Sequence, residues 1–329
     1  CFLLFDECHK LVKDADYRNN ITLPIDDFFK FDQKALVSAT PIELNDPRFK
    51  EQNFKMIEIQ PTFDYKKELW LHHTNNTLQA LKTVLSKLDN EEAAPLPICV
   101  FINSTDIIYS LMKQLDLLED SAVFCAPKSV DKLRRNKFTN AYEQCSIDKM
   151  KRYNFFTSRF FNAVDMELEE QPHVIMLTDV YFAEHTMIDP YTDAIQIVGR
   201  FRNGVSSITD ISNTKKGLPQ RSKEEIKGYL ICSKEIYRTM KNFYDCATDR
   251  ASRDAYRAAL ESLPFNRMLD RNGRENWFAI DNYMDEELMK MAHCDTAVKF
   301  YLPDNPQGFE TLSQIRTDLG PLQAEQETD

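Results

Sequence analysis

The chain opens with Cys1-Phe2-Leu3-Leu4-Phe5-Asp6-Glu7-Cys8-His9, an apolar run followed at once by two carboxylates and a histidine. A continuous apolar run of this length is typical of a strand that is buried on both faces of a parallel sheet. In open α/β sheets, ligands bind just beyond the carboxyl ends of the strands. The stretch therefore predicts an α/β fold with Asp6 and Glu7 at a ligand-binding edge.

Length and composition narrow the class of protein. A chain of 329 residues allows two or three domains, and no apolar run approaches the ~20 residues that a membrane helix needs. The net charge of −11 argues against indiscriminate nucleic-acid binding but leaves room for a local basic groove. The eight cysteines are scattered and form no Cys-x-x-Cys pair, which favours free thiols in a reducing, cytoplasmic compartment over a metal site.

The pattern of apolar runs predicts three segments. We expect residues 1–60 to be the C-terminal part of a first parallel-sheet lobe, 61–235 a second α/β lobe, and 236–329 a helical region without an assigned role. In the first lobe, strands are expected at 35–37 and 56–59. In the second, strands are expected at 98–102, 122–125, 155–157, 174–177 and 229–232, with helices over 78–88 and 106–115. Further helices are expected over 247–263 and 284–292, and the polar end 321–329 is expected to fray.

The Asp-Glu pair suits phosphoryl-transfer chemistry. Asp6 can hold Mg²⁺ through water, and Glu7 can orient or deprotonate a water that attacks a γ-phosphate. The alternative is an acidic strand-to-helix turn in which Asp6 caps the following helix.

Asp6-Glu7-Cys8-His9 resembles the DEAD/DEAH box of superfamily 2 helicases, and further matches follow in the order that this family has. The resemblance implies that Asp6 and Glu7 bind Mg²⁺ and ATP, and that Glu7 and His9 are catalytic. Ser38-Ala39-Thr40-Pro41 resembles motif III, so Ser38 and Thr40 are candidates for coupling the ATP site to the second lobe. The alternative for this stretch is a hydroxyl-rich turn.

Two weaker stretches point to nucleic-acid contacts. Val100-Phe101-Ile102-Asn103-Ser104 resembles motif IV, which implies that Ser104 lies near the nucleic-acid backbone; a core strand with a helix cap is the alternative. The stretch from Thr157 to Asp165 resembles motif V, which implies that Thr157 and Ser158 contact a phosphate and that Asp165 lies at the ATP site. Ala163 stands where glycine is usual, which puts the local turn in doubt, and Thr178 to Asp189 is a second candidate whose spacing fits less well.

Gln196-Ile197-Val198-Gly199-Arg200-Phe201-Arg202-Asn203-Gly204 is the most specific stretch and resembles motif VI. The resemblance implies that Gln196, Arg200 and Arg202 are catalytic and that both arginines bind ATP, because a guanidinium can grip a phosphate and spread its charge. The family usually places the second arginine three residues after the first, and here the separation is two. Which arginine acts as the finger stays open, and a helix start with two solvated arginines is the alternative.

Two clusters have a structural and a functional interpretation. One is a basic patch that follows the strand at 122–125 and could hold phosphates or be a solvated face: Lys128, Lys132, Arg134, Arg135 and Lys137. The other is a set of phenylalanines that we expect in the core rather than stacked on bases: Phe155, Phe156, Phe160 and Phe161.

The resemblance as a whole implies an ATP- and Mg²⁺-dependent helicase or translocase that acts on DNA or RNA and has two RecA-like lobes, the first incomplete. A phosphate-cradling loop needs the pattern Gly-x-x-x-x-Gly-Lys-Ser/Thr, and no glycine precedes Gly199. We therefore expect a fragment that starts at the Walker B box and does not hydrolyse ATP by itself. One alternative is an inactive nucleic-acid- or protein-binding remnant of such a helicase, and another is an unrelated α/β enzyme.

Overall fold

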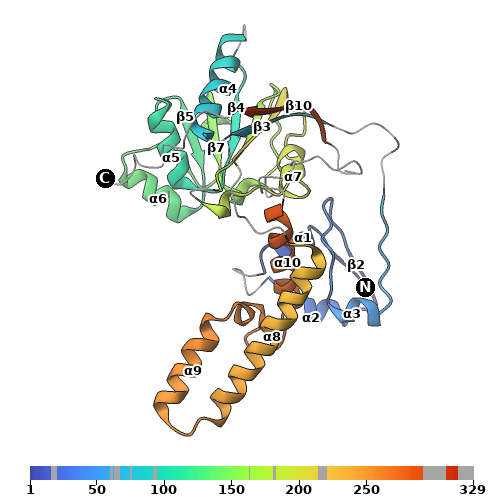
Figure 1. The fold of residues 1–329 in the computed structure, drawn as a ribbon. Coiled ribbons are helices and arrows are strands. Elements are labelled where there is room, and N and C mark those ends of the chain that lie inside the picture. The colour runs from blue at the N-terminus through green and yellow to red at the C-terminus, as the bar shows by residue number, and fades with distance from the viewer. Residues whose placement is uncertain are drawn as a thin grey trace. The chain divides into compact units, whose positions relative to one another are not determined.

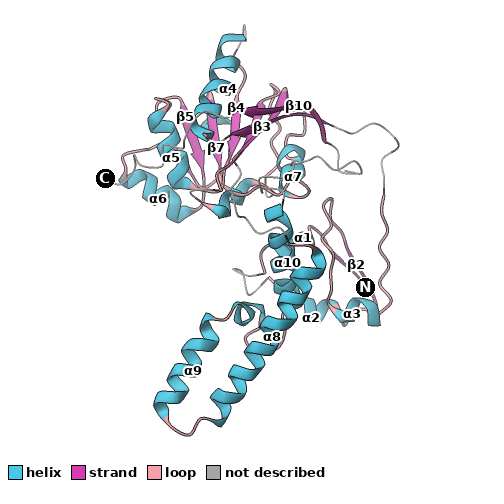
Figure 2. Ribbon diagram, viewed as in Figure 1, coloured by secondary structure: helices cyan, strands magenta, loops and turns pink. Residues whose placement is uncertain are grey.

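The computed structural model describes residues 1–15, 21–59, 62, 67–74, 76–91, 95–162, 164–180, 183–213, 221–291 and 309–317. The chain divides into two compact units (Figures 1 and 2). The first combines Cys1–Gln60 with Pro219–Met291, and the second combines Pro61–Leu218 with Ala292–Asp329. Each unit has hydrophobic clusters of its own.

The second unit is built on a parallel sheet with the strand order β10-β3-β9-β8-β4-β7-β5-β6. Its strands are β3 (Lys67–Thr74), β4 (Ile98–Phe101), β5 (Ser121–Phe124), β6 (Ala141–Tyr142), β7 (Tyr153–Phe156), β8 (His173–Thr178), β9 (Ser207–Ser212) and β10 (Phe309–Thr317). Strands β4, β5, β7 and β8 are buried along their whole length. The apolar runs in the sequence thus predicted the centre of this sheet correctly.

Helices cover both faces of the sheet. They are α4 (Thr77–Glu91), α5 (Thr105–Gln114), α6 (Pro127–Arg135) and α7 (Asp193–Gly199). Phe101 and Phe156 share one core with side chains of α7, whereas Val100 and Phe155 share the other with side chains of α4, α5 and α6. Alternate residues of each strand therefore feed opposite cores. The expected α/β class is confirmed, and so is the core position of Phe155, Phe156, Phe160 and Phe161.

The first unit contains a two-stranded parallel sheet, in which β1 (Phe2–Phe5) pairs with β2 (Gln33–Leu36). Its helices are α1 (His9–Lys13), α2 (Ile25–Phe28), α3 (Pro47–Glu51), α8 (Lys223–Cys246), α9 (Arg250–Ser262) and α10 (Trp277–Met291). One core joins α1 to Phe28, Phe49 and Phe278. A second core joins α8 to α10. The first unit thus combines the N-terminal segment with helices from far along the chain.

Two expectations for the first unit are wrong. Strand β1 is not buried on both faces, because Phe2 and Leu4 are 59% and 52% exposed while Leu3 and Phe5 pack against the core. The expected strand at 56–59 is an extended, exposed segment without strand pairing among the described residues. An apolar run becomes a strand only where a neighbour can take its backbone hydrogen bonds.

The end of the second segment also differs from expectation. The predicted strand at 229–232 is wrong, because these residues lie inside α8, which starts with a capping box between Ser222 and Glu225. Residues 221–235 consequently belong to the first unit rather than to the second. The helices expected over 247–263 and 284–292 are present as α9 and α10, but β10 makes part of the segment 236–329 a strand rather than a helix. The polar end 321–329 lies outside the described residues.

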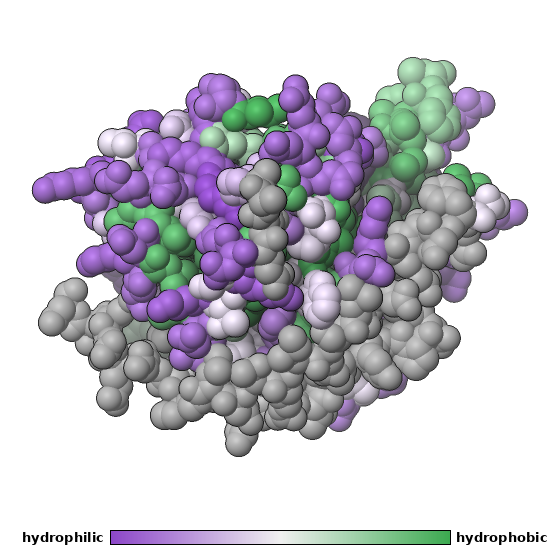
Figure 3. All heavy atoms as spheres, turned by 90° about the horizontal axis from the view of Figure 1, so that it is seen from above, coloured by the Kyte–Doolittle hydropathy of each residue, from purple (hydrophilic) through white to green (hydrophobic). Residues whose placement is uncertain are grey.

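In Figure 3, hydrophilic residues predominate among the coloured residues of the face shown, with apolar residues between them. Within the described part of the chain, no helix has both the length and the apolar character needed to cross a membrane.

Candidate functional site

The candidate residues of the first unit lie at the carboxyl ends of β1 and β2. Asp6 and Glu7 follow β1, and the segment from Ser38 to Pro41 follows β2. The backbone N–H of Cys8 donates to the carbonyl of Val37 at 3.0 Å, which holds the two strand ends together. Because the strands are parallel and adjacent, the stretch that resembles the DEAD/DEAH box and the stretch that resembles motif III meet at one edge.

A chain of polar contacts joins these two stretches. The Nδ1 atom of buried His9 lies 3.3 Å from Glu7 Oε2 and 3.0 Å from Ser38 Oγ. Ser38 Oγ in turn accepts the backbone N–H of Thr40 at 3.1 Å, and Thr40 is itself buried. These contacts link the Glu7 carboxylate, through His9 and Ser38, to the backbone at Thr40.

Glu7 has a backbone conformation that glycine usually adopts, with a φ of 52°. Non-glycine residues reach this left-handed region at an energetic cost and are found there mostly in turns or functional sites. The turn aims the Glu7 side chain toward His9 while the Glu7 N–H donates to Asp6 Oδ1 at 2.8 Å. The neighbouring Cys8 is buried, and burial raises the pKa of its thiol to about 11. Cys8 is therefore protonated at neutral pH and is not a nucleophile.

The two carboxylates fit a magnesium ion that takes most of its ligands from water and phosphate. Asp6 is exposed and the Glu7 side chain is partly exposed. Mg²⁺ is usually bound by one or two carboxylates together with waters and substrate phosphates. Among the described residues there is no cluster of three or more His, Cys, Asp or Glu side chains that could hold a metal ion by itself.

In the second unit, three candidate segments follow the adjacent strands β7, β4 and β8. Ser104 caps α5, where its Oγ accepts the N–H of Ile107 at 3.4 Å. Thr157 is buried, and its Oγ1 donates to the carbonyl of Phe124, whereas Ser158 is exposed. Asn103, which carried no assigned role in the sequence, links these segments: its Oδ1 accepts the N–H of Ser158, and its Nδ2 donates to the carbonyl of His185.

Arg200 and Arg202 follow α7, and both contact Asp165. Arg202 Nη2 lies 2.8 Å from Asp165 Oδ1, and Arg200 Nη1 lies 3.5 Å from the same oxygen. Backbone hydrogen bonds from Met166 to Arg200 and from Arg202 to Met166 hold the two segments side by side. The structure therefore brings together Asp165, Arg200 and Arg202, the residues of the second unit that the sequence predicted to lie at the ATP site.

The two arginines differ in how tightly they are held. Arg200 is 13% exposed and donates to the carbonyl and Oε1 of Gln196 and to the carbonyl of Asn162. Arg202 is 49% exposed and donates to Asp165 and to the carbonyl of Gly199. Gln196 is buried and fixes the Arg200 guanidinium. An exposed guanidinium on one carboxylate can change partners more easily than one held by several groups.

The second candidate for motif V, Thr178 to Asp189, connects β8 to α7. Thr178 Oγ1 donates to the carbonyl of Thr186 and accepts the N–H of Ile188. The Asp189 carboxylate accepts from the N–H of Tyr191 at 2.8 Å and from Thr192 Oγ1 at 2.6 Å. These buried hydrogen bonds fix the backbone of the segment that leads into α7. The doubtful position 163 lies outside the described residues.

The basic patch lies on and directly after α6, and most of its side chains are exposed. Lys132 forms an ion pair with Asp106 on the neighbouring helix α5. Thr105 Oγ1 donates to Ser129 Oγ at 3.2 Å, so the first turn of α6 lies beside the start of α5. Only the first part of the patch, at Lys128 and Lys132, is thus close to Ser104 at the carboxyl edge of the sheet; its last residue, Lys137, lines a hollow at the opposite edge.

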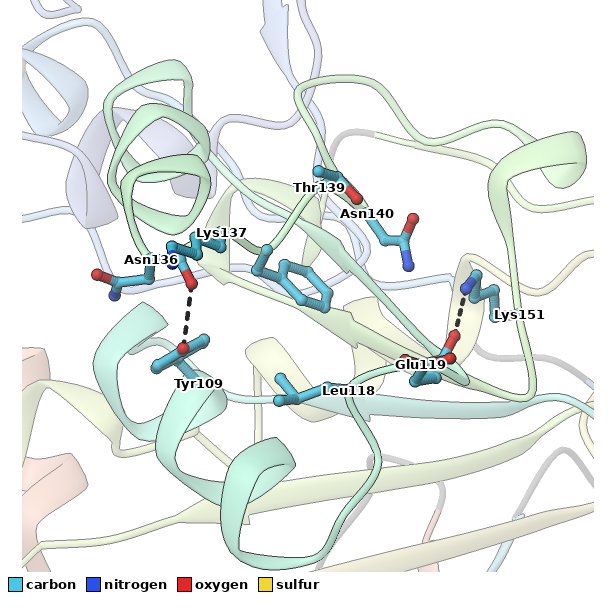
Figure 4. A pocket seen from close by; sticks show the side chains of 9 residues that line it. Tyr109, Leu118, Glu119, Asn136, Lys137, Thr139, Asn140 and Lys151 are labelled. Carbon is cyan, nitrogen blue, oxygen red and sulfur yellow. Dashed lines mark hydrogen bonds between the residues drawn. The ribbon is translucent and has the colours of Figure 1, made fainter.

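A surface hollow of about 390 Å³ lies elsewhere on the second unit (Figure 4). Its lining includes Glu119, Asn140 and Lys151, which precede β5, β6 and β7. The hollow is therefore at the amino-terminal edge of the sheet, opposite the edge that carries Ser104 and Thr157, and is not part of the candidate site.

Comparisons with known proteins complete this description. The chain matches no protein-family model and no curated protein sequence. Among solved structures it is similar to "S. cerevisiae Dbp5 bound to RNA and ADP BeF3", with 15% sequence identity and a TM-score of 0.40. The match covers 65% of this chain and 53% of that one, so the chain spans about half of that structure's length. At this level of similarity, no property of that protein is transferred to this chain.

Proposed function

We propose that this chain is part of a nucleic-acid-dependent ATPase of the helicase type, which uses Mg-ATP to move along or remodel DNA or RNA. The observation that carries the proposal is the contact chain from Glu7 through His9 and Ser38 to Thr40. In this proposal, Glu7 orients the attacking water. His9 and Ser38 couple movement of the Glu7 carboxylate to movement of the segment after β2. Such a connection is what a motor needs in order to couple hydrolysis to movement.

The other residues take the following proposed roles. Asp6 holds Mg²⁺ through water, and the ion neutralises charge on the phosphates when it is bound. Arg202 is the arginine that reaches the γ-phosphate, because it is the more exposed and the less restrained of the pair. Arg200 and Gln196 hold the turn that presents Arg202, and Asp165 binds both arginines until a phosphate takes its place.

The nucleic-acid contacts are proposed at the carboxyl edge of the second unit. Ser104, Thr157 and Ser158 follow neighbouring strands there, and the exposed Lys128 and Lys132 of the basic patch lie near Ser104. Hydroxyls, N–H groups and cations at such an edge suit the phosphates of either DNA or RNA. We also propose a cytoplasmic location, since the seven cysteines in the described part of the chain are all free.

The test separates the motor from an inactive binding remnant. The 329-residue chain contains no phosphate-loop pattern, so we expect it to bind single-stranded oligonucleotides but not to hydrolyse ATP. A longer chain with a phosphate-binding loop ahead of Cys1 should hydrolyse ATP, faster with DNA or RNA, and Glu7→Gln should abolish the stimulated rate. Stimulated turnover that survives Glu7→Gln contradicts the role of Glu7.

The second candidate function is a nucleic-acid- or protein-binding remnant. The exposed Phe2 and Leu4 on β1 favour it, because they offer an apolar strand face to a protein partner. This candidate predicts oligonucleotide or protein binding together with a longer chain that shows no nucleic-acid-stimulated ATPase activity at all.

A further inference from the structure

Helix α10 presents one face to the first unit's core. Phe278, Asp281 and Asp285 are spaced three and four residues apart, so they lie on the same side of the helix. Phe278 enters the core that also contains Leu11 and Val12 of α1. Asp281 contacts the segment that follows Thr40, and Asp285 contacts helix α1, which follows Glu7.

Asp281 holds the segment after Thr40. Its Oδ2 accepts the backbone N–H of Asn45 at 3.0 Å, and its Oδ1 accepts from Asn45 Nδ2 at 2.7 Å. Asp281 is only 3% exposed, and the two residues are 236 positions apart in the sequence. Both carboxylate oxygens therefore bind a single residue, five positions beyond Thr40.

Two further ion pairs act on the same parts of the unit. Lys13, the last residue of α1, pairs with Asp285 at 2.6 Å, and both side chains are largely buried. Lys223, the first residue of α8, pairs with Glu43 and thereby lowers the pKa of the Glu43 carboxyl. The C-terminal helices thus hold both the helix that begins at His9 and the segment that follows Thr40.

The carboxylate of Asp281 is buried at an electrostatic cost. Burial raises the pKa of Asp281 to about 6, Glu43 and Asp46 also raise it, and the hydrogen bonds from Asn45 only partly offset this. A buried carboxylate is often less favourable for stability than a well-packed apolar side chain. What the carboxylate supplies is a directional contact that fixes Asn45.

We propose that Asp281 is a positioning residue for the candidate ATP half-site. It fixes the segment between Thr40 and Asp46, while Asp285 fixes α1, so the C-terminal helices set the geometry of the contacts among Glu7, His9 and Ser38. The catalytic meaning of this arrangement rests on the proposed function. The positioning itself does not depend on it.

Hydrogen–deuterium exchange on the full 329-residue chain tests the proposal without ATP or nucleic acid, so it succeeds or fails independently of the proposed function. In Asp281→Ala, the amides of residues 38–46 should exchange about tenfold faster, the change expected from losing a hydrogen bond to a charged group. Asp281→Asn should show a smaller increase, because its Oδ1 can still accept from Asn45. Asp285→Asn should accelerate exchange mainly within residues 9–14.

Glu286→Ala is the matched control, since Glu286 lies on the same helix and is exposed. It should leave exchange over 38–46 unchanged. Wild-type exchange over 38–46 in Asp281→Ala overturns the proposal. So does an equal acceleration throughout the first unit in both Asp281 variants, because that pattern indicates general destabilisation rather than positioning.

Discussion

His9 Nδ1 lies 3.0 Å from Ser38 Oγ, although the two residues belong to different strand ends and are 29 positions apart. Ser38 Oγ also accepts the N–H of Thr40, so one hydroxyl serves two partners. This contact joins the two most informative stretches of the first unit, and its loss should separate them.

Ser38→Ala removes that hydroxyl, so buried His9 and the Thr40 N–H both lose their contact with Ser38 Oγ. We expect the free energy of unfolding of the first unit to fall by about 1–3 kcal/mol, the cost of leaving buried polar groups unsatisfied. Urea unfolding followed by circular dichroism measures this. Ser262→Ala, at the exposed end of α9, is the control and should change stability little; equal effects of the two substitutions argue against the contact chain.

Arg200 and Arg202 should separate into a structural and a chemical role. Arg200→Ala removes a largely buried guanidinium with several acceptors, so it should destabilise the second unit by about 1–3 kcal/mol. Arg202→Ala removes a half-exposed ion pair and should cost less than about 1 kcal/mol. In a longer chain with a phosphate loop, Arg202→Ala should lower nucleic-acid-stimulated ATP hydrolysis at least ~1000-fold. Normal ATP turnover in Arg202→Ala would show that another residue contacts the γ-phosphate.

The basic patch should contribute to oligonucleotide affinity through phosphate contacts. We expect Lys128→Ala combined with Lys132→Ala to weaken binding to single strands of any sequence and to lower the slope of log K against log[salt] by about 1 per lost contact. Fluorescence anisotropy across a salt series measures both effects. The charge-matched control is Lys82→Ala with Lys113→Ala, on α4 and α5; the same loss in both pairs means that only net charge matters.

Asp281 should make stability depend on pH between about 4 and 6. Its folded pKa of about 6 lies above its ordinary value of 3.8, so its favourable contribution is full below pH 4 and is lost as pH rises through 6. Asp281→Asn cannot ionise. The stability of wild type relative to Asp281→Asn should therefore fall by about 1–3 kcal/mol between pH 4 and pH 7, at 1.36 kcal/mol per pKa unit. A difference that stays constant with pH contradicts the burial of an ionising carboxyl.

Local sequence predicted the elements whose burial is complete. Strands β4 and β8 are continuous apolar runs, and the apolar spacing from Leu78 to Leu88 gave a helix at α4. Strands β3 and β9 went unpredicted because more than half of their residues are polar, and only pairing with neighbouring strands reveals them as strands. The run at 229–232 was misassigned because four apolar residues fit a strand or a helix equally well. The capping box at Ser222 and Glu225 was the readable signal for the helix.

The sequence by itself determined which residues carry the candidate chemistry and the order in which they occur, because both follow from side-chain type and strand-end position. Only the tertiary structure decided which of them touch. The His9–Ser38, Arg202–Asp165 and Asp281–Asn45 contacts span 29, 37 and 236 residues. Contacts of this range depend on strand pairing and helix docking, which arise from the burial of apolar surface over the whole unit and leave no mark in the spacing of the polar residues themselves.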